Sequence, residues 1–198
     1  MRIGVLGGTF DPPHIGHLVA AEEARVQLDL ERVVFVPAGS PPHKLDEPVT
    51  SVVHRVEMIT LAVASNPYFF VSLIDVERPG PSYSFEMVQR LRDQWNSDTE
   101  IYFIIGMDML SDLPNWHEPR QVVGLCRLAV VNRPGYDADM EDLEAIIPGI
   151  SQKVDHVSMP LLEVSSTDLR ERAHRGQVIR YYVPAEVEAY IRAHRLYA

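Results

Sequence analysis

Two histidines three residues apart, His14 and His17, follow a glycine-rich segment near the start of the sequence. The segment reads "GGTFDPPHIGH" and comes directly after the apolar run "RIGVL". On the first turn of a helix the two imidazoles would share one face, where they could bind zinc, exchange protons or donate N–H groups to phosphate oxygens. Zinc needs at least a third protein ligand, and no Cys or Glu stands at a motif spacing nearby. Phosphate binding is therefore favoured, because a helix N-terminus attracts anions.

The glycines of this segment match neither of the common nucleotide-binding fingerprints. A dinucleotide fold needs G-x-G-x-x-G, and a P-loop needs a Lys after the glycines. What remains is a turn in which Gly7 and Gly8 let a ligand approach the backbone, while Thr9 and Asp11 offer hydrogen bonds. The structural alternative makes one histidine a helix cap and the other a surface residue.

A second segment, "STDLRER" from residue 166 to 172, also predicts an anion site at a helix start. The hydroxyls of Ser165, Ser166 and Thr167 could face one anion together with Arg170, one turn later. Capping of the helix without a ligand is the alternative. In a third segment, "PAGSPPHK", Lys44 could hold a phosphate as a point charge or remain a solvated loop lysine.

The apolar run "FIIGMDML" places Gly106 and Asp108 at the end of an expected strand. An acidic side chain there is well placed for ribose hydroxyls, and a helix N-cap is the structural alternative. Trp116, in the following "NWHEP", is either a half-buried core ring or an aromatic platform for a flat heterocycle.

The elements that would position these residues alternate between strand and helix. Apolar runs rich in Val, Ile and Phe recur as "RIGVL", "RVVFVP", "FFVSLI", "EIYFII" and "RLAVV", with helical spacing of apolar residues between them. This alternation predicts an α/β fold, a Rossmann-like doubly wound and largely parallel sheet with helices on both faces. A single domain over residues 1–198 is expected, with its ligand site at the carboxyl ends of the strands.

Composition narrows the classes of function. The formal net charge of −10 disfavours a broad DNA or RNA footprint. Cys126 is the lone cysteine, so neither an internal disulfide nor a zinc cluster is indicated, and we interpret it as a core residue. No apolar segment approaches the length of a membrane span, and a cytoplasmic location is expected.

In this order, the segments resemble those of the HxGH nucleotidylyltransferase superfamily, and most closely its bacterial nicotinate mononucleotide adenylyltransferases. The resemblance covers nearly the whole chain, through "GGTFDPPHIGHL", "PPHK", "PSYS", "FIIGMDML", "NWH", "NRPG" and "VSSTDLRER". It implies adenylyl transfer from ATP to nicotinate mononucleotide, giving deamido-NAD and pyrophosphate. Nucleic acid and membrane are not expected as partners, and a homo-oligomer is compatible with the sequence.

The resemblance also implies roles for individual residues. His14, His17 and Arg170 would be catalytic, stabilising charge on the transferred phosphate. The implied ATP site comprises Gly8, Thr9, Phe10, His14, His17, Gly106, Asp108, Ser165, Ser166, Thr167 and Arg170. The implied site for the pyridine nucleotide comprises Lys44, Ser84, Trp116 and Arg133. Mg²⁺ would bridge phosphate oxygens and be held mainly by substrate and water, so no residue is expected as a metal ligand.

The sequence departs from the family pattern at a few positions. Ser84 stands where the family usually has Thr, and Ala38, Gly39 and Ser40 stand where an Asn is common. Three rival functions share some of these motifs: phosphopantetheine adenylyltransferase, a class I aminoacyl-tRNA synthetase, and a nucleotide sensor without activity. "NWH" and "PPHK" oppose the first, and the length and negative charge oppose the second. The intact His14, His17 and Arg170 oppose the third.

Overall fold

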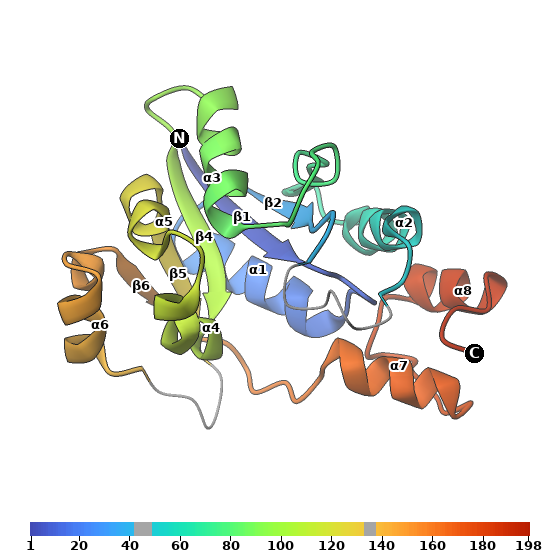
Figure 1. Cartoon of the computed structure of the whole chain (residues 1–198). Helices are drawn as coiled ribbons and strands as arrows, with labels where there is room; N and C mark the ends of the chain where they lie inside the picture. The colour runs from blue at the N-terminus through green and yellow to red at the C-terminus, as the bar shows by residue number, and fades with distance from the viewer. Residues whose placement is uncertain (42–48, 133–137) are drawn as a thin grey trace.

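The computed structural model describes residues 1–41, 49–132 and 138–198, and within these ranges six strands form one sheet (Figure 1). The strands are β1 (Arg2–Gly8), β2 (Arg32–Pro37), β3 (Phe69–Val71), β4 (Glu100–Gly106), β5 (Arg127–Val131) and β6 (Val154–Val157). Their order is β3-β2-β1-β4-β5-β6, and each neighbouring pair is parallel. This confirms the predicted Rossmann-like doubly wound fold.

Helices cover both faces of the sheet. One face carries α3 (Ser84–Gln94), α4 (Met107–Asp112), α5 (Pro119–Leu125) and α6 (Met140–Ile146), together with the short 3₁₀ helices η2 (Leu113–Asn115) and η3 (Ile150–Gln152). The other face carries α1 (Ile15–Gln27), α2 (Val52–Val63), α7 (Ser166–His174) and α8 (Ala185–Ala193). In Figure 1, α3 accordingly lies in front of the strands and α1 behind them. No helix among the described residues is both long and apolar enough to cross a membrane.

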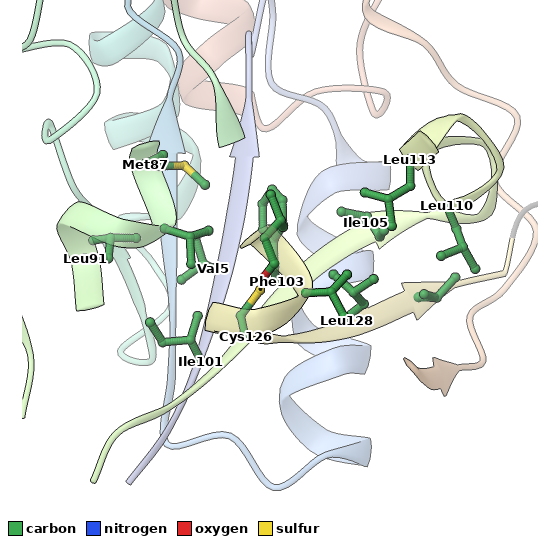
Figure 2. Close-up of a cluster of buried hydrophobic side chains, with 14 of the residues drawn as sticks. Val5, Met87, Leu91, Ile101, Phe103, Ile105, Leu110, Leu113, Cys126 and Leu128 are labelled. Carbon is green, nitrogen blue, oxygen red and sulfur yellow. Dashed lines mark hydrogen bonds between the residues drawn. The ribbon is translucent and has the colours of Figure 1, made fainter. Parts of the chain in front are cut away.

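The continuous apolar strands are explained by burial on both faces. In β4, Phe103 and Ile105 point into the core under α3 to α5, whereas Ile104 points into the core under α1 and α2. Figure 2 shows the first core, where strand side chains meet Met87 and Leu91 of α3. Cys126 lies in this core, which confirms its predicted role, and burial raises the pKa of its thiol to about 12.

The sheet reverses its winding between β1 and β4. These strands are neighbours, but the chain builds outward from β1 through β2 on one side and from β4 through β5 on the other. Ligands of open α/β sheets bind in the crevice that this reversal leaves at the carboxyl ends of the strands. Gly8 and Gly106 end the two strands, so the predicted ligand segments begin at this crevice.

Two local features differ from the sequence prediction. β6 was not predicted, because its sequence "VDHV" is short and half polar, as is common for an edge strand. Along α2, the apolar residues Val52, Val56, Ile59 and Val63 repeat at helical spacing, but only Ile59 and Val63 are buried, whereas Val52 and Val56 are partly buried. The buried face of the helix also includes Met58 and the charged Arg55. Apolar spacing alone could not reveal a buried arginine.

Candidate functional site

The turn after β1 is built around Phe10, whose backbone lies in the left-handed region with φ of 52°. Non-glycine residues adopt this conformation only where their surroundings enforce it. The Phe10 ring is buried in the core under α1 and α2, where it lies 5.9 Å from the ring of Phe35. It lines neither pocket described below, so a contact of Phe10 with ATP would have to come from its backbone.

The two histidines lie together at the start of α1, as predicted. Their rings are stacked with centroids 3.7 Å apart, and His14 is the N-cap residue. The backbone N–H of His14 donates to Nδ1 of His17 at 3.2 Å. Because Nδ1 accepts this bond, a neutral His17 carries its proton on Nε2, which makes Nε2 a hydrogen-bond donor.

Gly16, between the histidines, lies in tight packing. A Cβ at this position would lie 3.0 Å from Nδ1 of His14 and 3.0 Å from a methyl group of Val164. The segment before α7 thus approaches the start of α1 closely, and an alanine at residue 16 would require these side chains to move by a few tenths of an ångström. This approach brings two helix N-termini, those of α1 and α7, to one place, where both favour an anion.

The segment at the start of α7 contacts the turn after β1 directly; we call this turn, residues 9–14, the nucleotide turn. The hydroxyl of Ser166 donates to the carbonyl of Pro12 at 2.9 Å, and Arg170 donates to the carbonyl of Asp11 at 2.9 Å. Ser165 is the N-cap of α7 and accepts from the N–H of Asp168, so the capping role is confirmed, while the anion site stays a prediction. Thr167 accepts from Arg170 at 3.3 Å. Ser166 and Arg170 thus contact the turn, whereas the bonds of Ser165 and Thr167 lie within the α7 segment.

A pocket of about 440 Å³ opens between these two helix starts and the end of β4. Its lining includes Gly8, Thr9, His14, His17, Gly106, Asp108, Ser165 and Ser166. Eight residues of the predicted ATP site therefore surround one cavity, although they come from three separate parts of the sequence. Thr167 and Arg170 lie beside it on α7 without lining it. We call this cavity the nucleotide pocket, because the sequence predicts an ATP site here.

A second pocket of about 360 Å³ lies on the other side of the turn. It is lined by the loop after β2, the start of α3 and the segment after α4, and its wall includes Ser84 and Trp116. The two pockets share Gly7, Gly8, Thr9 and Met109. A group bound in one pocket would therefore meet a group bound in the other at this glycine turn. We call this cavity the acceptor pocket, because two of the residues that the sequence predicts for the site of the pyridine nucleotide line it.

Asp108 lines the nucleotide pocket, but it is not the N-cap of α4. The N-cap is Gly106, and Asp108 lies in the first turn of the helix. A Cβ on Gly106 would lie 2.4 Å from a carboxylate oxygen of Asp108, so the glycine makes room for the carboxylate. The capping alternative for Asp108 is wrong, and the contact with ribose hydroxyls stays a prediction.

Aromatic side chains form one wall of the acceptor pocket. Trp116 is half buried against Phe103, with ring centroids 6.1 Å apart, and it also lines the cavity. The interpretation of Trp116 as a half-buried ring is confirmed, and its role as a platform for a flat heterocycle stays a prediction. Tyr83 and His117 form a second pair across the same pocket, with centroids 4.4 Å apart. Neither was predicted as a site residue, although His117 belongs to the "NWH" motif.

A buried ion pair that the sequence did not reveal supports the acceptor pocket. Arg78 donates to Asp75 at 2.6 Å and to Glu86 of α3 at 2.7 Å, and both Arg78 and Asp75 are buried. The other oxygen of Asp75 accepts from the N–H of Gly39 at 3.2 Å. These contacts connect the loop after β2, the turn before α3 and the first turn of α3. All three segments carry residues of the pocket wall.

Two predicted site residues, Lys44 and Arg133, lie outside the described residues. In the ranges that are described, no three His, Cys, Asp or Glu side chains form a cluster that could hold a metal ion. The geometry so far comprises two adjoining pockets, two converging helix starts and a histidine pair at the junction. It can place two ligands end to end and surround a phosphate with donors between them.

The sequence profile of a family described as cytidylyltransferase-like matches residues 5–172. The chain belongs to this family. A relative from Thermomicrobium roseum, named probable nicotinate-nucleotide adenylyltransferase, is 45% identical over 99% of this chain and 91% of its own length. A Roseiflexus relative with the same name is 47% identical over 98% of this chain and 97% of its own. These full-length likenesses confirm the resemblance that the motifs indicated.

The fold of this cytidylyltransferase-like chain also matches solved structures. The Plasmodium falciparum nicotinic acid mononucleotide adenylyltransferase complexed with NaAD aligns with a TM-score of 0.80 at 19% identity. The alignment covers 99% of this chain and 97% of that one. A Vibrio parahaemolyticus structure described as a putative nicotinate-nucleotide adenylyltransferase aligns with a TM-score of 0.66 at 16% identity, covering 99% and 94%. At these identities the likeness establishes the shared fold.

Proposed function

We propose that residues 1–198 act as one nucleotidylyltransferase domain that transfers the adenylyl group of ATP to nicotinate mononucleotide. The products are deamido-NAD and pyrophosphate, so the reaction is a step of NAD biosynthesis. The observation that carries this proposal is the junction of the two pockets at Gly7, Gly8 and Thr9. The names of the relatives support the choice of reaction.

In the proposed arrangement ATP occupies the nucleotide pocket and nicotinate mononucleotide the acceptor pocket. A 5′-phosphate oxygen of the mononucleotide attacks the α-phosphorus of ATP in line, a P–O bond forms, and the bond to pyrophosphate breaks. The substrate is the Mg²⁺ complex of ATP, whose ion offsets phosphate charge. No protein nucleophile is needed, because reactions of this kind depend on positioning and charge stabilisation.

His17 is well placed to stabilise the transferred phosphate. Its Nδ1 accepts the backbone N–H of His14, which directs the Nε2 proton away from that backbone. Both histidines line the nucleotide pocket at the positive end of the α1 dipole. Ser165 and Ser166, at the start of α7, face the same cavity. We propose that Arg170 acts beside them on the distal phosphates.

The acceptor pocket suits a flat ring that carries a carboxylate. Trp116 offers an aromatic face in its wall. Tyr83 and Ser84, at the start of α3, line the same wall, and the positive end of that helix favours the carboxylate of nicotinate over the neutral amide of nicotinamide. The preference for nicotinate is part of the proposal. The cytoplasmic location and a homo-oligomer stay predictions from the sequence.

The experiment that tests the proposed function measures pyrophosphate release from ATP and Mg²⁺. Nicotinate mononucleotide, nicotinamide mononucleotide and phosphopantetheine are supplied separately at equal concentration. We expect release chiefly with nicotinate mononucleotide. Release chiefly with phosphopantetheine would assign the chain to another branch of the family. Binding of ATP without release for any acceptor would favour a sensor.

Gly39→Ala should weaken binding of the mononucleotide. A Cβ on Gly39 would lie 2.6 Å from the backbone carbonyl oxygen of Asp75, so one of the two segments must shift. Because both border the acceptor pocket, we expect KM for nicotinate mononucleotide to rise about tenfold with little change in KM for ATP.

The matched control is Gly124→Ala in α5, where a Cβ would meet no atom within 4 Å. Its steady-state constants should equal those of the unmodified protein. Equal constants for Gly39→Ala would show that the loop after β2 tolerates the shift and does not shape the acceptor pocket.

A further inference from the structure

The carboxylate of Asp11 lies at a junction of separate segments beneath the nucleotide turn. Only 2% of the Asp11 surface is exposed. One carboxylate oxygen accepts the N–H of Thr50 at 3.0 Å, and the other accepts the hydroxyl of Tyr197 at 2.7 Å. The backbone carbonyl of Asp11 accepts from Arg170 of α7. Three segments distant in sequence thus hold one residue of the turn.

Arg55 supplies the compensating charge next to this carboxylate. Its guanidinium is buried and donates to the carbonyls of Thr9 and Thr50, each at 2.9 Å, and to that of Gly39 at 3.3 Å. Burial lowers the pKa of Arg55, and the Asp11 carboxylate counteracts this effect. Thr9 belongs to the nucleotide turn and Gly39 to the loop of the acceptor pocket, so the network reaches both binding sites.

Tyr197 completes the network from the segment after α8. The backbone adopts left-handed conformations at Arg195, with φ of 50°, and at Tyr197, with φ of 66°. Such conformations are disfavoured for these residues, so the contacts of the segment must hold them. Burial, followed by the Asp11 carboxylate, raises the pKa of the Tyr197 hydroxyl. The hydroxyl therefore remains protonated and donates at neutral pH.

We propose that Tyr197 is a positioning residue, whose hydroxyl holds the Asp11 carboxylate and thereby fixes the turn that carries Thr9 and His14 between the two substrates. This inference rests on the proposed adenylyl transfer. In-line attack requires the reacting atoms to be aligned closely, so a small displacement of the turn reduces the rate of the chemical step. Most of each pocket wall comes from other segments, so binding should change less than turnover.

The first test compares Tyr197→Phe with the unmodified protein at a temperature where both are folded. We expect kcat to fall about tenfold, while KM for ATP and for nicotinate mononucleotide each change less than about threefold. The matched control is Tyr190→Phe. Tyr190 lies on α8, in the same C-terminal part of the chain as Tyr197, and its hydroxyl forms a hydrogen bond with His54 of α2. The control should leave kcat unchanged. An unchanged kcat in Tyr197→Phe, or a loss of folding, would overturn the inference.

A double-mutant cycle with Asp11→Asn separates positioning from general destabilisation. If the hydroxyl acts through Asp11, the double variant should lose little more kcat than the worse single variant. If the fold-losses in kcat of the two single variants multiply in the double variant, the two residues act independently. That result would refute the proposal that Tyr197 acts through Asp11.

Hydrogen exchange provides a readout that needs no substrate. The backbone amides of Thr9, Phe10, Asp11 and His14 should exchange faster in Tyr197→Phe than in the unmodified protein, and at an unchanged rate in Tyr190→Phe. If the unmodified protein shows no adenylyl transfer, the proposed function fails, while this comparison still decides whether Tyr197 holds the turn. Equal exchange in all three proteins would overturn the positioning role.

Discussion

His17→Ala lowers kcat by about 10²-fold or more, as expected when a donor to developing charge is removed. The imidazole lines the nucleotide pocket, and its Nδ1 is held by the N–H of His14. Alanine removes the Nε2 donor and also the stacking partner of His14. Because the lost interaction would be strongest in the transition state, kcat should fall more than KM for ATP rises. Steady-state kinetics of pyrophosphate release measure both constants.

Two further variants make this result specific. His17→Gln retains an N–H donor at a similar distance from the backbone, so it should keep more activity than alanine. His174→Ala replaces an exposed histidine at the end of α7 and should leave turnover unchanged. Near-normal turnover in His17→Ala would remove His17 from the mechanism.

Arg78→Ala should reduce the free energy of unfolding by about 3–5 kcal/mol, the usual cost of removing one partner from a buried ion pair. The substitution leaves the Asp75 carboxylate buried, with the N–H of Gly39 still donating to it. It also releases Glu86 at the first turn of α3. Urea denaturation followed by circular dichroism measures the change.

Arg175→Ala is the comparison for a surface ion pair. Arg175 pairs with Glu171 on α7, where both side chains are exposed, and its loss should change the unfolding free energy by less than about 1 kcal/mol. A loss below about 1 kcal/mol in Arg78→Ala as well would mean that the buried pair contributes no more than an exposed one. The acceptor pocket would then have to be held in shape by other contacts.

Most of the fold followed from local patterns in the sequence. Five apolar runs marked β1 to β5. For β1, β2, β4 and β5 the reason is burial on both faces of the sheet, whereas β3 is an edge strand with an exposed Phe70. β6 was not predicted, because Asp155 interrupts its run of apolar residues. This carboxylate pairs with Arg127 on the neighbouring strand. An edge strand can expose such charges, so its pattern resembles that of a loop.

The candidate site was predicted in part. Four of the predicted residues line one pocket: His14, His17, Ser165 and Ser166. They could be predicted because each lies where a helix begins, and such positions can be recognised from local sequence. Phe10 was expected beside ATP; its ring lies in the core and its backbone is left-handed, so the prediction now concerns a contact from the backbone. A backbone angle of this kind has no reliable signature in a single sequence.

The sequence by itself determined the alternation of strands and helices, the places where glycine and proline break them, and the family. These features depend on residues a few positions apart, where periodicity and turn chemistry act. Only the tertiary structure decided which charged residues are buried and which groups they bind. Tyr197 and Asp11 are 186 positions apart, and Arg55 meets Thr9 across 46 positions. The energy of such contacts arises from removing polar groups from water beside their partners, and only the folded chain brings those partners together.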